Sequence, residues 1–113
     1  MKYIKTFENI EDEPKVGDYV IINRISNLSD KIGEIVDIID IKKDWKIDWK
    51  DLLFQIKYIN VPKAILQRIS NFANYRIIKG STVIVELSGR SISEWSTDRE
   101  YLEVIISAKK YNI

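Results

Sequence analysis

Residues 15–22 read Lys-Val-Gly-Asp-Tyr-Val-Ile-Ile, residues 31–38 read Lys-Ile-Gly-Glu-Ile-Val-Asp-Ile, and residues 52–58 read Leu-Leu-Phe-Gln-Ile-Lys-Tyr. All three stretches are rich in β-branched and aromatic residues, which favour extended backbone. In the third, apolar residues at positions 52, 54, 56 and 58 alternate with a set that includes Gln55 and Lys57. Such alternation is typical of a strand with one buried face. We therefore expect three strands of a small, strongly bent sheet, at 19–24, 32–41 and 52–58.

The length and composition indicate one globular domain. The chain has 113 residues, of which 45% are hydrophobic and 31% are charged, a balance that suits a single core. We expect residues 1–13 to form an N-terminal arm and residues 14–113 to form the domain. No apolar run approaches the roughly 20 residues of a membrane span, and the first residues lack the features of a signal peptide. The expected location is therefore the cytoplasm.

Two residue types are missing, and their absence excludes whole classes of chemistry. The chain contains no His and no Cys, which excludes Ser-His and Cys-His nucleophiles and Cys/His zinc sites. Carboxylates remain as candidates for acid–base or metal chemistry, namely Glu34, Asp37, Asp40, Asp44 and Asp48. Lysines lie near them in the sequence, and no motif frames them. We expect no catalytic residue, no metal site and no cofactor, and we predict that the protein is not an enzyme.

The second half of the chain predicts two helices and a further strand. Pro62 suits the first turn of a helix, and apolar residues at positions 65, 66, 69 and 72 share one face of a helix that ends near residue 73. A fourth strand is expected at 81–87, followed by a tight turn and a short extended piece at 92–95.

The C-terminal helix is expected at 98–110, where apolar residues recur with helical spacing. The preceding sequence Thr97-Asp98-Arg99-Glu100 fits a capping box, in which the Thr97 hydroxyl accepts a hydrogen bond from the amide of Glu100. Trp95, just before it, is expected to pack this helix against the sheet.

The spacing of the first three strands resembles that of KOW-type and related SH3-like barrels. In those families an apolar-Gly-Asp-x-Val strand precedes a Gly-x-Ile/Val-Val strand and an aromatic-x-Val-x-aromatic strand. The matching residues are Val16-Gly17-Asp18-Tyr19-Val20, Ile32-Gly33-Glu34-Ile35-Val36 and Phe54-Gln55-Ile56-Lys57-Tyr58. The chain departs from the family in its long second connection and in the helix after the third strand. The resemblance implies an α+β fold: an SH3-like, mostly antiparallel small β-barrel with an inserted short helix and a C-terminal helix.

The two ends of the chain are similar to those of small uncharacterised proteins of large tailed bacteriophages. The similar residues are Met1 to Glu8 and the tail from Ile92 to Asn112. Abundant Ile and Lys with scarce Ala and Gly also suggest an AT-rich genome. The resemblance implies an accessory phage protein that acts in the bacterial cytoplasm. It does not indicate any particular activity.

Residues 42–50 contain the first candidate binding site. The tripeptide Asp44-Trp45-Lys46 recurs as Asp48-Trp49-Lys50. The two tryptophans would form an exposed protein-binding anchor, or would stack nucleobases while lysines supply charge. In a third interpretation they cap the open end of the barrel, because Trp is usually substantially buried. The lysines of this candidate site are Lys42, Lys43, Lys46 and Lys50.

Two further sets of residues are candidates for binding. Tyr19, Tyr58 and Tyr75 would line an aromatic groove of the kind that grips extended peptides, or would simply pack in the core or at its rim. A secondary basic face around the inserted helix would form if the fold gathers the cations there, and the alternative is an ordinary solvated face. The cations of this secondary basic face are Lys63, Arg68, Arg76 and Lys79.

We favour the hypothesis that the chain is a non-catalytic phage accessory protein that binds a host protein. It would inhibit or redirect a defence system, as anti-CRISPR proteins do, or transcription. The alternative is a KOW-type nucleic-acid-binding module, and a second alternative is a structural virion component. The net charge of +1, from 18 basic and 17 acidic residues, does not favour general attraction to phosphate backbones. No membrane partner is expected, and the sequence leaves the oligomeric state open.

Overall fold

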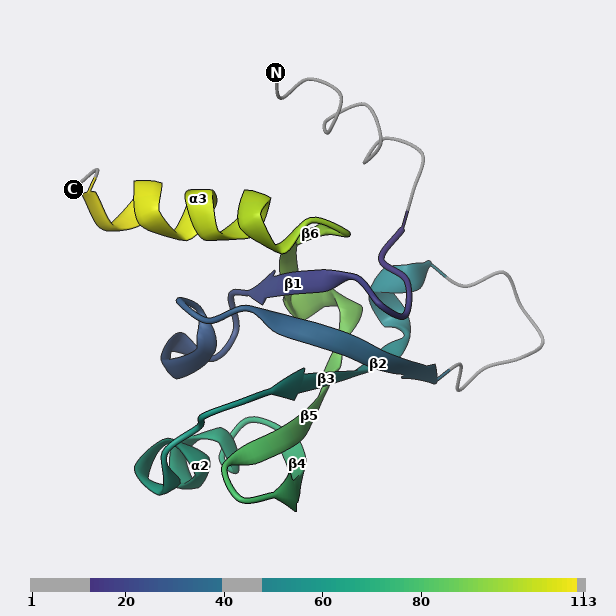
Figure 1. Ribbon diagram of the computed structural model, residues 1–113. Coiled ribbons are helices and arrows are strands. Elements are labelled where there is room, and N and C mark those ends of the chain that lie inside the picture. Colours follow the sequence, from purple (N-terminus) through teal and green to yellow (C-terminus); the bar gives the residue numbers. More distant parts are fainter. Residues whose placement is uncertain (1–12, 40–47, 112–113) are drawn as a thin grey trace.

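The computed structural model describes residues 13–39 and 48–111, which form one six-stranded antiparallel sheet with helices on both sides (Figure 1). The strand order is β4-β5-β3-β2-β1-β6. The strands are β1 (Tyr19–Ile22), β2 (Gly33–Ile39), β3 (Leu53–Tyr58), β4 (Asn74–Lys79), β5 (Thr82–Ser88) and β6 (Ile92–Ser96). The α-helices are α2 (Lys63–Ile69) and α3 (Arg99–Tyr111), and the short 3-10 helices are η1 (Ser26–Leu28), η2 (Trp49–Asp51) and η3 (Gly89–Ser91).

The main core lies on one face of the bent sheet. In β3 the alternation expected from the sequence is confirmed, because Phe54, Ile56 and Tyr58 are buried and the residues between them are half-buried. Inward residues of β1, β2 and β5 join the same cluster. The elements η1 and α2 cover this face with further buried side chains, namely Leu28 from η1 and Leu66 and Ile69 from α2.

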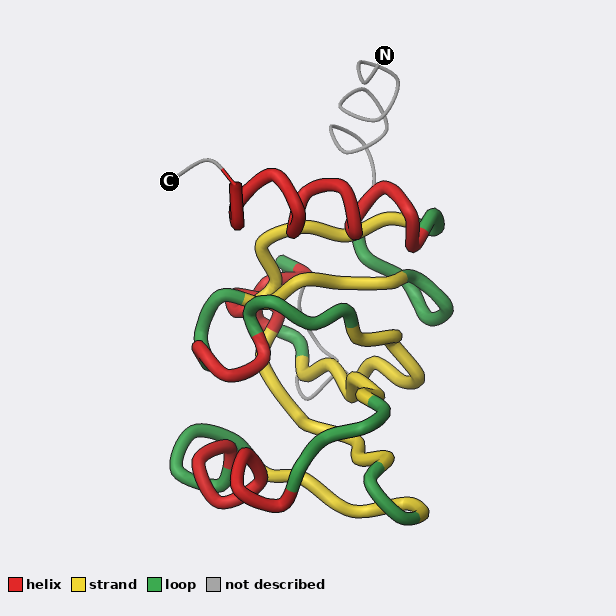
Figure 2. Tube along the Cα trace, turned by 60° about the vertical axis from the view of Figure 1, so that its left-hand side comes forward, coloured by secondary structure: helices red, strands yellow, loops and turns green. Residues whose placement is uncertain are grey.

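A second, smaller apolar layer lies on the opposite face of the sheet. Ile21 stands between two core residues of β1, so its side chain points away from the main core. It is nevertheless buried, as is Leu102 of α3. Helix α3 packs on β1 and β6, and Figure 2 shows it running along that end of the sheet. The expectation that a C-terminal helix packs on the sheet is therefore confirmed.

The α+β class is confirmed, but the sheet does not close into a barrel. The described strands β4 and β6 have one neighbour each and form the two edges of an open sheet. The sheet also differs from the expected barrel in having an additional strand, because residues 74–79 form a strand that the pattern did not predict. β4 pairs with β5 across the tight turn at Gly80 and so becomes the edge strand next to β5.

The start of α3 also differs from the expectation. The amide of Glu100 donates to the Asp98 side chain (3.0 Å), and the amide of Asp98 donates to the Ser96 hydroxyl (2.9 Å). Asp98 is therefore the capping residue, and the predicted box built on Thr97 is wrong. A carboxylate at this position also suits the positive end of the helix dipole.

Neither of the described α-helices has the length and hydrophobicity needed to cross a lipid bilayer.

Candidate functional site

Trp49 is the first residue of η2, and its side chain packs against the main core. Its ring meets Phe54 edge-on, with centroids 6.2 Å apart, and meets Trp95 at an interplanar angle of 67° and a centroid distance of 5.1 Å. The Lys50 ammonium lies 5.9 Å from the centroid of the Trp49 ring. Trp49 and Trp95 are both half-buried and pack against the main core. These contacts favour the interpretation in which Trp49 caps the core.

The backbone of η2 lies directly against η3. A Cβ atom on Gly89 would stand 2.5 Å from the carbonyl oxygen of Trp49 and 2.9 Å from the Cα of Lys50. Only glycine therefore allows this approach. The Gly89 amide donates to the carbonyl of Leu52 (3.0 Å), which ties η3 to the start of β3.

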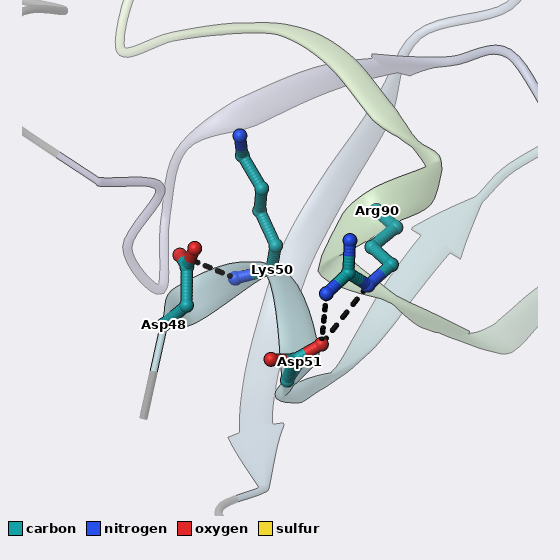
Figure 3. Close-up of polar contacts among 4 residues, drawn as sticks. All are labelled: Asp48, Lys50, Asp51 and Arg90. Atoms are coloured by element: carbon teal, nitrogen blue, oxygen red, sulfur yellow. Dashed lines mark hydrogen bonds and ion pairs between the residues drawn. The ribbon is translucent and has the colours of Figure 1, made fainter. Parts of the chain in front are cut away.

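Polar contacts cover the outer side of this junction, as Figure 3 shows. The Arg90 guanidinium holds one carboxylate oxygen of Asp51 through Nη2 (2.7 Å) and Nε (2.9 Å). Asp48 caps η2 by accepting the amide of Lys50 (3.2 Å). The four residues are solvent-exposed and lie in or next to η2 and η3.

Much of the tryptophan and lysine candidate site lies outside the described residues. This applies to Lys42, Lys43, Trp45 and Lys46, and to the carboxylates Asp40 and Asp44. From that candidate site the structure places Trp49, which is packed as above, and Lys50, which is exposed.

The structure does not bring the candidate tyrosines together. Tyr58 is only 1% exposed and belongs to the main core, where its hydroxyl has no hydrogen-bond partner among the described residues. Burial there raises the pKa of its hydroxyl. Tyr19 lies on the opposite face of the sheet, with the Arg99 guanidinium 5.9 Å from its ring. Tyr75 lies on β4, at the far edge from Tyr19.

The four cations of the secondary basic face all lie at the α2–β4 end of the molecule, and all are exposed. The amide of Val61 donates to the carbonyl of Ser81 (3.0 Å), which holds the start of α2 beside the turn that ends β4. Lys63 lies two residues after Val61, and Lys79 lies two residues before Ser81. Within residues 13–39 and 48–111, none of the four cations forms an ion pair.

Next to these cations, the outer side of β4 pairs with no other described strand, and we call it the β4 edge (Asn74–Lys79). Five of its six residues are exposed. Ile77 is 55% exposed and Ile78 is 49% exposed, and Phe72 just before the strand is 56% exposed. At the opposite edge no residue of β6 is exposed, since Ile92 and Trp95 pack on the main core and α3 also contacts this strand. Within the described residues, the side chains of β6 are therefore covered, whereas those of β4 are mostly exposed.

A cavity of about 510 Å³ lies between α3 and the loops before β2 and after β3. Charges of both signs line it, including Lys31, Arg99 and Glu103, and the last two form an ion pair of 3.2 Å. With Asp30, the lining carries two cationic and two anionic side chains.

In the part of the chain that the structure describes, no three His, Cys, Asp or Glu side chains gather as metal ligands would. Comparison of the chain with protein-family models, curated proteins and solved structures gives no match.

Proposed function

We propose that the protein is a non-catalytic binding protein that contacts another protein through the β4 edge. The observation that carries this proposal is the uncovered strand, with Ile77 and Ile78 each about half exposed. An edge strand presents unpaired backbone N–H and C=O groups, and proteins normally cover or shield such edges. Extended segments of partner proteins bind at these edges by adding a strand.

The phage-like ends of the chain support a more specific partner. We propose that the partner is a protein of a bacterial host and that binding takes place in the host cytoplasm. Occupying a host protein would inhibit a defence system, as anti-CRISPR proteins do, or would interfere with transcription. Such a role requires a surface and no catalytic residue, which agrees with the absence of His and Cys.

The finer fold assignment belongs to the same proposal. We propose that β1, β2, β3, β5 and β6 correspond to an SH3-like small barrel that remains open, and that α2 and β4 are an insertion into it. The shared core of these five strands supports this assignment. So does the position of α2 and β4, which lie between β3 and β5 in the chain.

A nucleic-acid-binding module is the second candidate, and one observation favours it. The cations of the secondary basic face are exposed and unpaired among the described residues, as phosphate contacts would require. The contacts of Trp49 argue against nucleic-acid binding, since Trp95 and Lys50 occupy positions where a base would stack.

The proposed function is tested by affinity capture from nuclease-treated bacterial lysate. The bait is the tagged protein, compared with Ile78→Lys on β4 and with Val104→Lys as a matched control. Val104 lies on α3 and is 66% exposed, so the control makes the same substitution at an exposed apolar residue of another surface. We expect one host protein to be retained by the original chain and by Val104→Lys but lost with Ile78→Lys. Recovery of the same proteins by all three baits, or of nothing after nuclease treatment, would reject the proposal.

A further inference from the structure

We infer that the β4 edge selects an acidic, extended segment of its partner and binds it as a seventh strand. This inference rests on the proposed function and deepens it, because it gives the chemistry of the bound segment. Three features carry it: the distribution of charge along the chain, the register of β4 against β5, and the unpaired backbone of the edge.

The charge distribution is strongly uneven although the net charge is only +1. Residues 52–85 contain no acidic residue, so all 17 acidic residues lie elsewhere in the chain. The same stretch contains Lys57 and the four cations of the secondary basic face. Lys57 is paired with Glu34 (3.7 Å), whereas the four are not paired with any described carboxylate. The α2–β4 end is therefore a basic surface that attracts an acidic partner.

The register places two of these cations on one face of the sheet. Arg76 is opposite Ile84 of β5, and Lys79 is opposite Thr82, so both side chains lie on the face away from the main core. A bulge between Ile77 and Lys79 makes this possible. In a regular strand, residues three apart would point to opposite faces, and bulges are known to redirect side chains in this way.

The other face of β4 is apolar. Tyr75 is opposite Val85 and Ile77 is opposite Val83, so both point to the side of the main core, where Tyr75 packs against it and Ile77 stays exposed. A strand added beside β4 would therefore have apolar side chains next to Tyr75 and Ile77. Its alternate side chains would lie next to Arg76 and Lys79, where carboxylates fit best. The edge thus specifies a segment in which acidic and apolar residues alternate.

Backbone pairing distinguishes this ligand from a nucleic acid. The outward N–H and C=O groups of β4 match those of a peptide strand, which pairs with them residue by residue. A phosphate backbone would satisfy the cations but would leave the outward carbonyls and the half-exposed isoleucines without partners.

The inference is tested with short fluorescein-labelled peptides and fluorescence anisotropy. The first peptide alternates Glu with Val, and a second alternates Lys with Val. Two further versions of the first peptide carry N-methyl groups on alternate amides, one on the odd positions and one on the even positions. Only one of these sets can face β4, because backbone groups of a strand alternate in direction. A single-stranded dT oligonucleotide serves as the phosphate probe.

We expect the Glu peptide to bind and the Lys peptide to bind at least about tenfold more weakly. One methylated version should lose binding while the other retains it. The double substitution Arg76→Glu with Lys79→Glu should weaken binding of the Glu peptide by about tenfold or more, whereas Lys109→Glu with Lys110→Glu on α3 should leave it unchanged. Unchanged far-ultraviolet circular dichroism would show that both variants are folded.

Equal binding of the Glu and Lys peptides, equal effects of the two methylated versions, or tighter binding of the oligonucleotide would each overturn the inference. Lack of binding by the Glu peptide would overturn it too. If the lysate experiment nevertheless captures a host protein that Ile78→Lys loses, only the assigned chemistry of the segment fails, and the proposed function stands.

Discussion

Arg76 and Lys79 lie on the same face of the sheet, although three positions along a regular strand would place them on opposite faces. The bulge between Ile77 and Lys79 produces this arrangement. Both cations are exposed, and neither is ion-paired with a described residue. Cations that the fold does not use are available to a partner.

The first prediction concerns the stability of the basic face. Replacing Arg76 and Lys79 together by Gln should change the free energy of unfolding by no more than about 0.5 kcal/mol, because exposed residues without specific contacts contribute little. Urea denaturation followed by circular dichroism measures this change. A loss of several kcal/mol would show that these cations stabilise the fold, and would remove the argument that they serve binding.

The second prediction assigns Trp49 a structural role. Trp49→Ala should lower the free energy of unfolding by about 2 kcal/mol or more, because it removes the aromatic contacts with Phe54 and Trp95. Trp49→Phe should retain most of the stability. The affinity of the folded Trp49→Ala protein for its partner should remain unchanged. A variant of full stability that had lost partner binding would instead identify Trp49 as a binding anchor.

The third prediction concerns the contact of η3 with η2. Gly89→Ala should destabilise the protein by about 1–3 kcal/mol, because the added Cβ would meet the backbone at Trp49 and Lys50. Arg90→Gln removes the ion pair with Asp51 from the same junction and should cost about 1 kcal/mol or less, since exposed ion pairs contribute little. Thermal unfolding of the two variants separates packing from charge. A larger loss in Arg90→Gln than in Gly89→Ala would contradict this view of the junction.

The fourth prediction concerns the buried hydroxyl of Tyr58. Tyr58→Phe should leave stability unchanged or raise it by about 1 kcal/mol, because it removes a buried polar group that has no described hydrogen-bond partner. Destabilisation by more than that amount would indicate a hydrogen bond that the hydroxyl makes in solution.

The same residue predicts how stability depends on alkaline pH. Burial raises the pKa of Tyr58 in the folded protein above its ordinary value of 10.0. Above that pH the unfolded chain releases the proton while the folded chain keeps it, so stability falls as pH rises. Denaturant unfolding at pH 9 to 11 should show a steeper fall for the original chain than for Tyr58→Phe. Parallel pH profiles for the two proteins would contradict the assignment.

The sequence predicts those elements whose burial leaves a periodic pattern. Phe54, Ile56 and Tyr58 face the core at alternate positions, so β3 was recognisable. The helical spacing of apolar residues likewise indicated α3. The strand β4 left no such pattern, because five of its six residues are exposed and give no buried side to alternate with. The sequence also did not predict that the sheet is open, since strand pairing depends on contacts between residues that are remote in sequence.

The sequence predicted only part of the candidate surface. The four cations Lys63, Arg68, Arg76 and Lys79 stood out as a possible face from their charge alone. Ile77 and Ile78 did not, because two adjacent isoleucines in a short sequence normally indicate burial. Their exposure follows from the position of β4 at the end of the sheet. A stretch of 34 residues without an acid, from 52 to 85, was the available signal that this region would form one basic surface.

Photo-crosslinking in bacterial cells tests whether the β4 edge is where another protein binds. The photoreactive amino acid p-benzoylphenylalanine is placed at Ile78 on β4 in one variant and at Val104 on α3 in the other, two exposed apolar positions on separate surfaces. We expect irradiation to join the variant labelled at position 78 to one host protein, and the variant labelled at position 104 to none. Adducts from position 104 alone, or the same set of adducts from both positions, would contradict the proposal that the β4 edge is the binding surface.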